Sequence, residues 1–441
     1  MRIMISGTSS GCGKTTVTLA LMAKLRAAGH SIAPFKSGPD YIDPGFHFVA
    51  ADAPSHNLDP FLMREESIRQ VIQLGMAGRE IGVIEGAMSY YDGIGPEGEC
   101  SAWSLARMTD TPVLLVIDAS GSATGAAATA LGFCEYRAPS NIAGFIINQV
   151  GSERHYQLVR DAIQSRLGLP CVGYMRKDKN IHLESRHLGL IPAEELPDLR
   201  DRLAQTAELL VLDEEQLFKI AARAPRLETV PMRHSKRFPG FRMGVARDEA
   251  FGFYYEANLE MLRRMDMELV FFSPLRDMRL PDDLDGLYLG GGFPEIFAEM
   301  LAANESMRAS VRAALEGGLR CYAECGGMMY LTEAIDGASM AGFLPFRCRM
   351  TERLQRFGYV HIRDRTDGFR FRAHEFHHSL EEGDGALEHA FDIRRATGAG
   401  TGWSGGYRKH NTLAAYPHVH FWNEEALVLR LFGLEEPKCE G

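Results

Sequence analysis

The sequence predicts two α/β domains in series, each built on a doubly wound sheet of mainly parallel strands. In the first half, short apolar runs alternate with helical stretches and end in glycine-rich or acidic turns. A second series of such runs starts at Met243, after a proline-rich basic segment. Buried strands that alternate with helices indicate parallel sheets, whose functional groups lie on the loops after the strand ends.

The positions of the apolar runs give the expected elements. In the first half, strands are predicted at residues 2–6, 31–35, 81–84, 113–117 and 144–147, and helices at 15–28 and 154–167. The second series of strands is predicted at 243–246, 268–272, 284–289 and 319–323. Between the two series, residues 193–222 have an acidic, helical pattern, and residues 223–242 carry six Lys or Arg against one acid. We therefore expect domains at 1–195 and 242–441, joined by a helical and basic linker at 196–241.

Length and composition are those of a globular enzyme. The chain has 441 residues, of which 45% are hydrophobic and 24% charged, which fits two folded domains. A net charge of −10 argues against a nucleic-acid binder held by a broad basic surface. No apolar run is long enough to span a bilayer, and the N-terminus has the pattern of a strand, not of a signal peptide. We expect a cytoplasmic protein with no nucleic-acid or membrane partner, and the sequence leaves open whether it forms a homodimer.

A phosphate-binding loop is predicted at residues 7–16, GTSSGCGKTT, between the first strand and a helix. Glycines let backbone N–H groups turn toward phosphate oxygens, and the helix N-terminus adds partial positive charge. Lys14 supplies a point charge for the β- and γ-phosphates, and the Thr15 hydroxyl is suited to ligate Mg²⁺. The first glycine stands one place earlier than the strict motif requires. We expect ATP to bind here through Gly11, Gly13, Lys14, Thr15 and Thr16.

Charged residues follow the next strands of the first domain. Lys36 lies at the end of the second strand, and we expect it to touch the γ-phosphate. Asp40 and Asp43 come next and are candidates to hold Mg²⁺ or to steer an attacking group, although the pattern alone favours an ordinary acidic turn. Glu85 closes the strand at 81–84 and is expected to be the second metal-binding element. The predicted Mg²⁺ ligands are Thr15, Asp40 and Glu85.

A cysteine nucleophile turn is predicted at Cys325, because residues 321–330 have the pattern of a strand, a sharp turn and a helix. Small residues at Ala323 and Gly327 meet the steric requirement of a nucleophile elbow. A helix N-terminus favours the thiolate, which is the reactive form. Upstream, the glycine triplet 290–292 offers backbone N–H groups for an oxyanion hole, with Gly291 and Gly292 as substrate-binding residues. Such a site suits hydrolysis of a carboxamide through a thioester, and a buried core cysteine is the alternative.

The general base is expected among the histidines late in the chain. His418 and His420 lie on alternating faces of an extended segment, so only one of them faces Cys325. Triad glutaminases usually carry Glu two residues after the histidine, but that position is His420 here. The orienting acid is therefore absent or comes from elsewhere, and we predict a Cys–His dyad. The histidines at 374, 377 and 378 have no second ligand cluster beside them, so we expect structural or substrate-contacting roles.

Together these motifs resemble the cobyrinate a,c-diamide synthase family. The resemblance spans essentially the whole chain and includes, in order, the phosphate loop and residues 36–44, 57–59, 85–92, 246–251, 272–275, 290–295, 323–327 and 374–379. It implies an N-terminal P-loop domain similar to dethiobiotin synthetase and a C-terminal class I glutamine amidotransferase domain. Two departures from the family pattern are small: Pro417 replaces an aliphatic residue and His378 replaces a Tyr.

The resemblance also implies an activity. The family uses glutamine, ATP and Mg²⁺ to convert the a and c acetate side chains of cobyrinate or hydrogenobyrinate to amides in cobalamin biosynthesis, a carbon–nitrogen ligase reaction. Chemical logic places an acyl phosphate on the path, because a carboxylate has no good leaving group. By the same resemblance, Cys325 is the glutaminase nucleophile and His418 its base. Asp43 and Asp92 are implied as catalytic residues, and the segment Asp40, Tyr41 and Ile42 as substrate-binding.

Other functions share parts of this pattern. The same diamidation of sirohydrochlorin, Ni-sirohydrochlorin or sirohaem would use the same motifs. A partition-type ATPase switch has no use for a glutaminase half, and Ser9 stands where that class carries a lysine. A binding or sensor protein with an inactive glutaminase domain disagrees with the intact Cys325 and His418. The reaction itself predicts a sheltered path for ammonia, and the net charge of −10 predicts a basic cleft for a polycarboxylate tetrapyrrole, drawn in part from residues 223–242.

Overall fold

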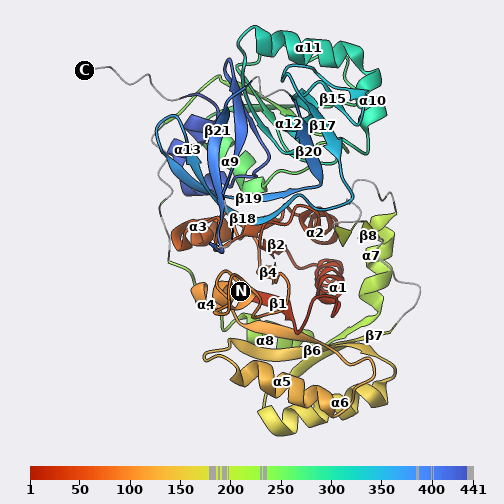
Figure 1. The fold of residues 1–441 in the computed structure, drawn as a ribbon. Helices are drawn as coiled ribbons and strands as arrows, with labels where there is room; N and C mark the ends of the chain where they lie inside the picture. Colours follow the sequence, from red (N-terminus) through yellow and green to blue (C-terminus); the bar gives the residue numbers. More distant parts are fainter. Residues whose placement is uncertain are drawn as a thin grey trace. The chain divides into compact units, whose positions relative to one another are not determined.

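The computed structural model describes residues 1–177, 185–186, 189–190, 196, 198–228, 231, 236–383, 387–398, 400 and 402–434. The chain divides into two compact units, Met1–Met232 and Arg233–Gly441, which Figure 1 shows as separate sets of strands and helices. Residues 229–230 and 232–235 of the expected basic linker lie outside the described residues. Within the described part, no helix has the length and apolar character needed to cross a membrane.

The first unit is built on an eight-stranded sheet with the strand order β10-β7-β6-β5-β1-β4-β2-β3. Seven strands run parallel, and β10 pairs antiparallel with β7 at one edge. The strands are β1 (Arg2–Gly7), β2 (Ile32–Ser37), β3 (His56–Leu58), β4 (Ile81–Glu85), β5 (Val113–Asp118), β6 (Ile142–Val150), β7 (Cys171–Arg176) and β10 (Leu210–Leu212). A separate two-stranded pair consists of β8 (Ser185–Arg186) and β9 (Gly189–Leu190). The parallel, helix-covered sheet confirms the predicted fold class for this half.

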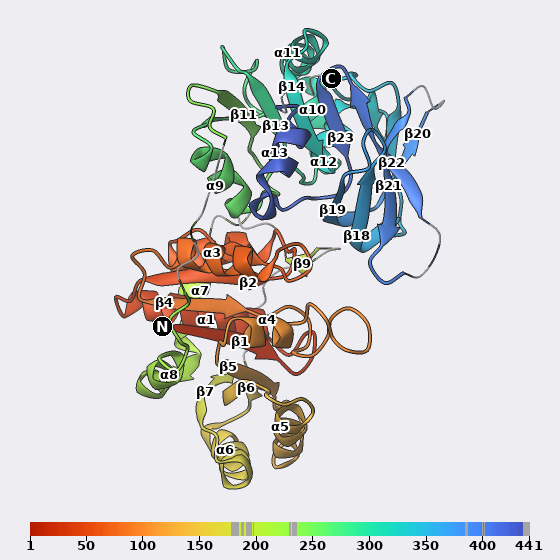
Figure 2. The same cartoon turned by 90° about the vertical axis from the view of Figure 1, so that its left-hand side faces the viewer.

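Helices cover the sheet of the first unit, as Figures 1 and 2 show. They are α1 (Lys14–Ala27), α2 (Asp43–Ala51), α3 (Glu65–Gly75), α4 (Ala102–Met108), α5 (Gly125–Glu135), α6 (Glu153–Leu167), α7 (Leu199–Glu208) and α8 (Glu214–Ala221). The sequence pattern assigned α7, β10 and α8 to the linker. In the structure Leu203, Leu210 and Ile220 are buried in the same core as β1 and α1, because the apolar face of each element needs a partner surface.

The second unit has a nine-stranded sheet with the order β12-β11-β13-β14-β23-β22-β21-β18-β19. The parallel strands are β11 (Arg242–Ala246), β12 (Glu268–Phe272), β13 (Gly286–Leu289), β14 (Arg320–Glu324) and β23 (Thr412–Ala415). The antiparallel strands are β18 (Arg356–Asp364), β19 (Arg370–His377), β21 (His389–Arg395) and β22 (Trp403–Lys409). The parallel part contains all four strands that the sequence predicted, whereas the antiparallel part was not anticipated.

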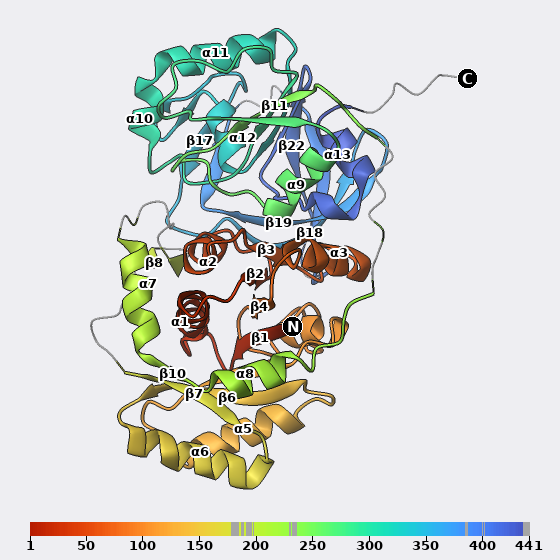
Figure 3. The ribbon, with the colours of Figure 1, turned by 180° about the vertical axis from the view of Figure 1, so that it is seen from behind.

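Five α-helices of the described residues accompany this sheet: α9 (Glu256–Arg264), α10 (Ala298–Ala303), α11 (Glu305–Glu316), α12 (Gly326–Leu331) and α13 (Glu425–Leu431). Figure 3 shows α9 and α13 side by side, with α10 and α11 together away from them. A smaller sheet is formed by β15 (Ala334–Ile335), β16 (Ala338–Ser339), β17 (Arg347–Met350) and β20 (Ser379–Glu382). The parallel strands and helices place the loops after β13, β14 and β23 at one end of the sheet, where the predicted cysteine site lies.

Candidate functional site

The predicted phosphate loop connects β1 to α1 and depends on its glycines. Gly11 and Gly13 have φ of +78° and +86°, in the left-handed region that favours glycine. A Cβ at Gly13 would also stand 2.1 Å from Nδ2 of Asn148. That amide, on β6, donates a 2.9 Å hydrogen bond to the carbonyl of Cys12 and so holds the loop in place. The loop therefore has the backbone shape that presents N–H groups to an anion.

Lys14 and Thr15 begin α1 directly after this loop. Lys14 is half-buried and has no side-chain hydrogen bond or ion pair within the described residues, so its ammonium is available to a phosphate. The Thr15 hydroxyl donates a 2.5 Å hydrogen bond to Oε1 of Glu85, at the end of β4. Thr16 is the next residue of the helix and is half-buried.

A buried ionic cluster lies beside the loop, at the ends of β2 and β4. Nζ of Lys36 is 3.1 Å from Oε1 of Glu85 and forms a second ion pair with Asp43. Nε2 of His47 is 2.7 Å from the other oxygen of Glu85, and its Nδ1 is 3.0 Å from the Ser55 hydroxyl. Lys36 is 4% exposed and Glu85 is 0% exposed. Lys36 is thus held inside a network of ion pairs, and its contact with the γ-phosphate stays a prediction.

The charge balance of this cluster is negative. Three carboxylates, Asp40, Asp43 and Glu85, share one ammonium. Burial opposes ionisation of Glu85, but Lys36 and His47 outweigh it and hold the pKa of Glu85 far below its usual range. Burial and the neighbouring Asp40 raise the pKa of Asp43 to about 8, against the opposing effect of Lys36. A cation that entered this site would favour the ionised form of Asp43.

The oxygen donors fit Mg²⁺ better than a metal that needs a full protein cage. Within the part of the chain that the structure describes, no three His, Cys, Asp or Glu side chains converge as a metal-binding group. Mg²⁺ commonly takes only one or two protein oxygens and fills its shell with phosphate oxygens and water. Of the predicted ligands, Thr15 and Glu85 touch each other. Asp40 is engaged differently, because its Oδ1 accepts hydrogen bonds from the N–H groups of Ile42 and Asp43 at the start of α2.

The segment Asp40–Tyr41–Ile42 is positioned by β3. The amide of Asn57 donates to the carbonyls of Gly38 and Asp40 at 2.9 and 2.7 Å. Tyr41 and Ile42 are half-buried and lie next to the ionic cluster in sequence. The sequence pattern of this segment favoured an ordinary acidic turn. In the structure the segment forms an ordered turn at the start of α2, and this turn brings Asp43 to Lys36.

Asp92 lies in a cavity of about 680 Å³ that is lined by aromatic rings. The rings are those of Tyr91, Phe133 and Tyr136, and Tyr91 stacks on Phe133 with centroids 5.6 Å apart. The Asp92 side chain is exposed. The structure thus places Asp92 in a partly apolar cavity of ligand size.

In the second unit, Cys325 forms a sharp elbow between β14 and α12. Its φ of +47° and ψ of −107° lie outside the regions that a non-glycine residue normally adopts. A Cβ at Gly327 would stand 2.2 Å from the carbonyl oxygen of Leu289, so a larger residue there would close the turn. Cys325 is 8% exposed. These features match the nucleophile elbow that the sequence predicted.

His418 lies beside this elbow with an acid behind it. Nδ1 of His418 is 3.6 Å from Oε2 of Glu324, the residue that precedes the nucleophile. Burial opposes the charged imidazolium, but interactions with the thiol of Cys325 and with Glu324 outweigh it and raise the pKa of His418 to about 10. The second candidate, His420, accepts a hydrogen bond from the N–H of Trp422. The geometry is that of a Cys–His–Glu arrangement, whereas the sequence analysis predicted a Cys–His dyad.

The glycine triplet is held against His418 and the turn that carries Cys325. The N–H of Gly290 is bonded to the Tyr254 hydroxyl at 2.8 Å, and a Cβ at Gly291 would stand 2.5 Å from Cε1 of His418. A Cβ at Gly326, the residue after the nucleophile, would be 3.1 Å from the nitrogen of Gly292. Backbone N–H groups of Gly291 and Gly292 are therefore in place as candidates for an oxyanion hole.

The histidines of β19 support this centre. His374 exchanges two backbone hydrogen bonds with His418, at 3.0 and 2.8 Å. Burial, together with the neighbouring His418, lowers the pKa of His374 to about 3, so it stays neutral beside the base. His377 is 3.0 Å from Glu375 and stacks on Tyr416 with centroids 3.7 Å apart. These contacts describe supporting residues of the Cys325 centre.

Comparison with known proteins places the chain in a family. Residues 3–191 match the model of the CobQ/CobB/MinD/ParA nucleotide binding domain, and residues 242–426 match that of the CobB/CobQ-like glutamine amidotransferase domain. A protein from Priestia megaterium named cobyrinate a,c-diamide synthase is 38% identical, over 97% of this chain and 95% of the relative. Proteins of the same name from Listeria innocua and Thermoplasma acidophilum are each 39% identical, over 98% and 95% of this chain. This chain belongs to the cobyrinate a,c-diamide synthase family.

Family membership confirms the resemblance drawn from the motifs, and the geometry adds two residues that the motifs did not reveal. Glu324 was not predicted, because the acid of a triad glutaminase usually lies two residues after the histidine, whereas this acid immediately precedes Cys325. His47, which binds Glu85, lies within α2 with no motif around it. The only sign of His47 in the sequence is its position one helical turn after Asp43 in α2.

Proposed function

We propose that this chain is an ATP- and glutamine-dependent carbon–nitrogen ligase that converts the a and c acetate side chains of cobyrinate, or of metal-free hydrogenobyrinate, to primary amides. The observation that carries the proposal is that one chain combines a phosphate loop at Lys14 with a Cys325–His418–Glu324 centre. The name shared by its relatives supplies the acceptor. Each chain holds the residues for both half-reactions, so the proposal is the same for a monomer and for a homodimer.

In the glutaminase half-reaction, Sγ of Cys325 attacks the side-chain carbonyl carbon of glutamine. His418, whose raised pKa makes it the holder of the thiol proton, passes that proton to the departing nitrogen, so that ammonia leaves and a thioester remains. The N–H groups of Gly291 and Gly292 stabilise the negative oxygen of the tetrahedral intermediate. Water then hydrolyses the thioester to glutamate and free thiol, with His418 again moving the proton. Glu324 orients His418 and stabilises its charged form.

In the ligase half-reaction, a carboxylate oxygen of the tetrapyrrole attacks the γ-phosphorus of ATP, and ADP departs. Ammonia then attacks the carbonyl carbon of the acyl phosphate, phosphate leaves, and the ammonium nitrogen loses a proton to give the amide. Lys14 and the loop N–H groups bind the phosphates during transfer. Lys36 holds Asp43 and Glu85 in place, and Asp43, in the ionised form that a cation in the site would favour, is the candidate to accept the proton released from the attacking nitrogen.

We propose Mg²⁺ as the metal of the ATP site. When bound, it supplies charge neutralisation between the β- and γ-phosphates. The Thr15 hydroxyl and an oxygen of Glu85 or Asp40 would hold it, directly or through water. ATP and glutamine are abundant in the cytoplasm, and we place the reaction there.

The aromatic cavity around Asp92 is the proposed acceptor site of the first unit. A tetrapyrrole is flat and largely apolar on its faces, and the rings of Tyr91, Phe133 and Tyr136 offer surfaces for stacking. Arg137 also lines the cavity and is suited to a propionate or acetate carboxylate. Asp92 is exposed there, in reach of a bound side chain.

Mass spectrometry of the products tests the proposal. The protein is incubated with ATP, Mg²⁺ and glutamine together with one of several tetrapyrrole acids: cobyrinate, hydrogenobyrinate, sirohydrochlorin, Ni-sirohydrochlorin or sirohaem. Two successive losses of about one mass unit, from replacing OH by NH₂, are expected with cobyrinate or hydrogenobyrinate. If only one of the other acids reacts, that acid is the substrate. Glutamine-independent ATP hydrolysis with no amide product from any of them would contradict the ligase assignment.

A further inference from the structure

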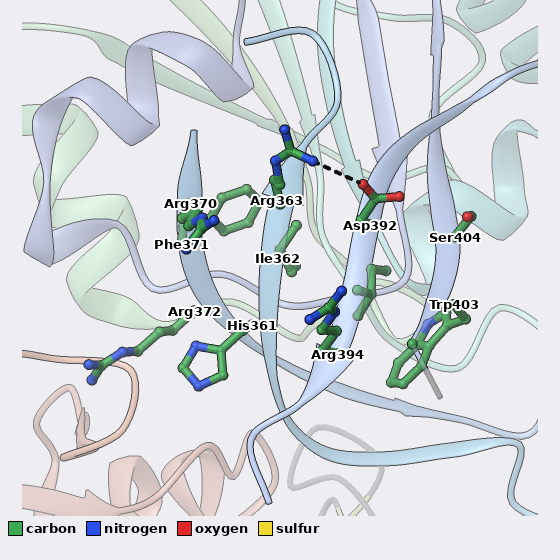
Figure 4. A pocket seen from close by; sticks show the side chains of 12 residues that line it. His361, Ile362, Arg363, Arg370, Phe371, Arg372, Asp392, Arg394, Trp403 and Ser404 are labelled. Atoms are coloured by element: carbon green, nitrogen blue, oxygen red, sulfur yellow. Dashed lines mark ion pairs between the residues drawn. The ribbon is translucent and has the colours of Figure 1, made fainter. Parts of the chain in front are cut away.

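A strongly basic surface lies on the antiparallel half of the second unit's sheet. It borders a cavity of about 710 Å³, within the range of about 300–1,000 Å³ common for small-molecule sites. Figure 4 shows its cationic side chains on β18, β19 and β21. We define the basic face as His361, Arg363, Arg370, Arg372 and Arg394, all of which line the cavity and are exposed.

The strand register places the side chains of the basic face directly opposite one another. His361 on β18 pairs with Arg372 on β19 and with Arg394 on β21. Two residues along β18, Arg363 pairs with Arg370. Cross-strand neighbours have Cβ atoms about 4.5–5.5 Å apart, and like charges at that separation, as in the pair Arg363 and Arg370, destabilise a sheet. The arrangement therefore has an energetic cost that a bound anion would offset.

The described residues supply little negative charge to this surface. Asp392 is the one acid among the described residues that line the cavity. Its carboxylate lies 3.7 Å from Nη1 of Arg363, the ion pair drawn in Figure 4, and 2.8 Å from Nη2 of Arg365. Arg370 and Arg394 form no ion pair with a carboxylate in the described ranges. Burial and the nearby Arg372 lower the pKa of His361, which agrees with a surplus of positive charge.

Protection of a sheet edge explains only part of this pattern. β19 is the edge strand of the sheet, and charged residues on edge strands commonly prevent association with other chains. His361, Arg363 and Arg394, however, lie on β18 and β21, which have neighbours on both sides. The arginines on these inner strands do not protect an edge, and Arg394 has no carboxylate partner in the described ranges, so an anionic ligand is the alternative explanation.

We propose that the basic face binds carboxylates of the tetrapyrrole substrate, an inference that rests on the proposed function. Guanidinium groups bind carboxylates with paired hydrogen bonds. Trp403 lines the same cavity and lies 4.7 Å below the guanidinium of Arg356, so its indole gives the site a flat apolar wall. These cations also offset, locally, the net charge of −10 that repels a polycarboxylate.

This assignment changes where the basic cleft is expected. From the sequence, residues 223–242 were predicted to contribute because this short segment carries six Lys or Arg and one acid. The cations of the basic face are spread over residues 361–394 and are brought together only by strand pairing. An alternation of exposed Arg with buried apolar residues, as at Arg370-Phe371-Arg372, is the sequence signal that marks such a face.

The test compares two double variants that remove equal charge from matched positions. Arg370→Gln/Arg372→Gln changes two exposed residues that flank a buried one on β19. Arg347→Gln/Arg349→Gln is the control, with the same exposed–buried–exposed pattern on β17, away from the cavity. The readouts are equilibrium binding of cobyrinate by absorbance titration without ATP, and kcat and KM for cobyrinate at saturating ATP and glutamine.

The β19 variant is expected to raise both the Kd and the KM for cobyrinate roughly tenfold or more, with kcat nearly unchanged and a weaker dependence on salt. The control should stay within about twofold of the wild type. Glutamine hydrolysis at Cys325 should be unaffected in both. If the β19 variant does not fold, Arg394→Gln on β21 provides the same comparison from another strand.

The outcomes separate this inference from the proposed function. Wild-type amidation with equal Kd and KM in the β19 variant and the control would overturn the role of the basic face and leave the ligase assignment intact. A wild type that binds cobyrinate through these arginines but forms no amide would overturn the proposed function alone. A wild type that does not bind cobyrinate would overturn the inference.

Discussion

Oε2 of Glu324 lies 3.6 Å from Nδ1 of His418, although the two residues are 94 positions apart and Glu324 is the residue immediately before the nucleophile. The second oxygen of Glu324 accepts a 3.2 Å hydrogen bond from the N–H of Val419. One carboxylate therefore fixes both the imidazole and the backbone next to it. The orienting acid and the nucleophile come from the same strand end, so their spacing is fixed by β14.

We predict that Glu324→Gln lowers glutamine hydrolysis strongly while ammonia-dependent amidation continues. The amide keeps the size of the side chain but removes the charge that stabilises imidazolium, and related substitutions in catalytic triads cost roughly 10²- to 10⁴-fold in kcat. Steady-state rates with glutamine and with ammonium chloride measure the two activities. Glu316→Gln, on the exposed end of α11, is the control and should leave both rates near the wild-type value.

Cys325→Ala provides the reference for that experiment. It should abolish the glutamine-dependent rate and leave the ammonia-dependent rate, since the thiol takes part only in releasing ammonia. Lys14→Gln should lose both rates, because phosphoryl transfer is common to both. Loss of the ammonia-dependent reaction in Cys325→Ala would show that the two centres do not act independently.

The pH dependence of glutamine hydrolysis should be set by His418. Its pKa is raised to about 10, so the imidazolium persists through neutral pH and is lost only as the pH rises through about 10. We expect kcat/KM for glutamine to fall on the alkaline side. No acid limb from His418 should appear near pH 6.5, the ordinary pKa of a histidine side chain. In Glu324→Gln the alkaline limb should move to lower pH, because one of the interactions that raise the pKa is removed. An unchanged limb would show that another group controls it.

The sequence was most informative where function depends on neighbouring residues. The phosphate loop and the elbow at Cys325 need particular residues within a few positions, so the pattern alone predicted them. Glu324, His47 and the basic face depend on pairings between distant strands and helices, which spacing does not encode. The four antiparallel strands were missed for a related reason: their apolar residues alternate with Arg and His, as at Arg370–His377, and give no continuous apolar run.

Asn148 provides a test of the support behind the phosphate loop. Asn148→Ala removes the 2.9 Å hydrogen bond to the carbonyl of Cys12 and leaves that buried acceptor unpaired. The expected cost is about 1–2 kcal/mol, or roughly a five- to thirtyfold rise in the KM for ATP. Glutamine hydrolysis at Cys325 should not change. Asn141→Ala, whose amide donates a 3.3 Å hydrogen bond to the carbonyl of Ala106, is the control, and a rise in its KM for ATP of similar size would remove the specific role of Asn148.

The buried His56 should make the free energy of unfolding fall at acid pH. It is 6% exposed, and burial lowers its pKa to about 4. Above about pH 6.5 the imidazole is neutral in both the folded and the unfolded chain, so it has no effect. As the pH falls from about 6.5 to 4, the unfolded chain binds a proton that the folded chain does not, and the free energy of unfolding drops by about 3 kcal/mol.

Urea denaturation at a series of pH values measures this slope. In His56→Gln the titrating group is gone, so the decrease in stability between about pH 6.5 and 4 should be smaller by that amount, whatever the variant's stability at neutral pH. Equal slopes in His56→Gln and the wild type would mean that His56 is protonated in the folded protein as readily as in the unfolded chain, which would contradict its burial in an apolar environment beside Phe35.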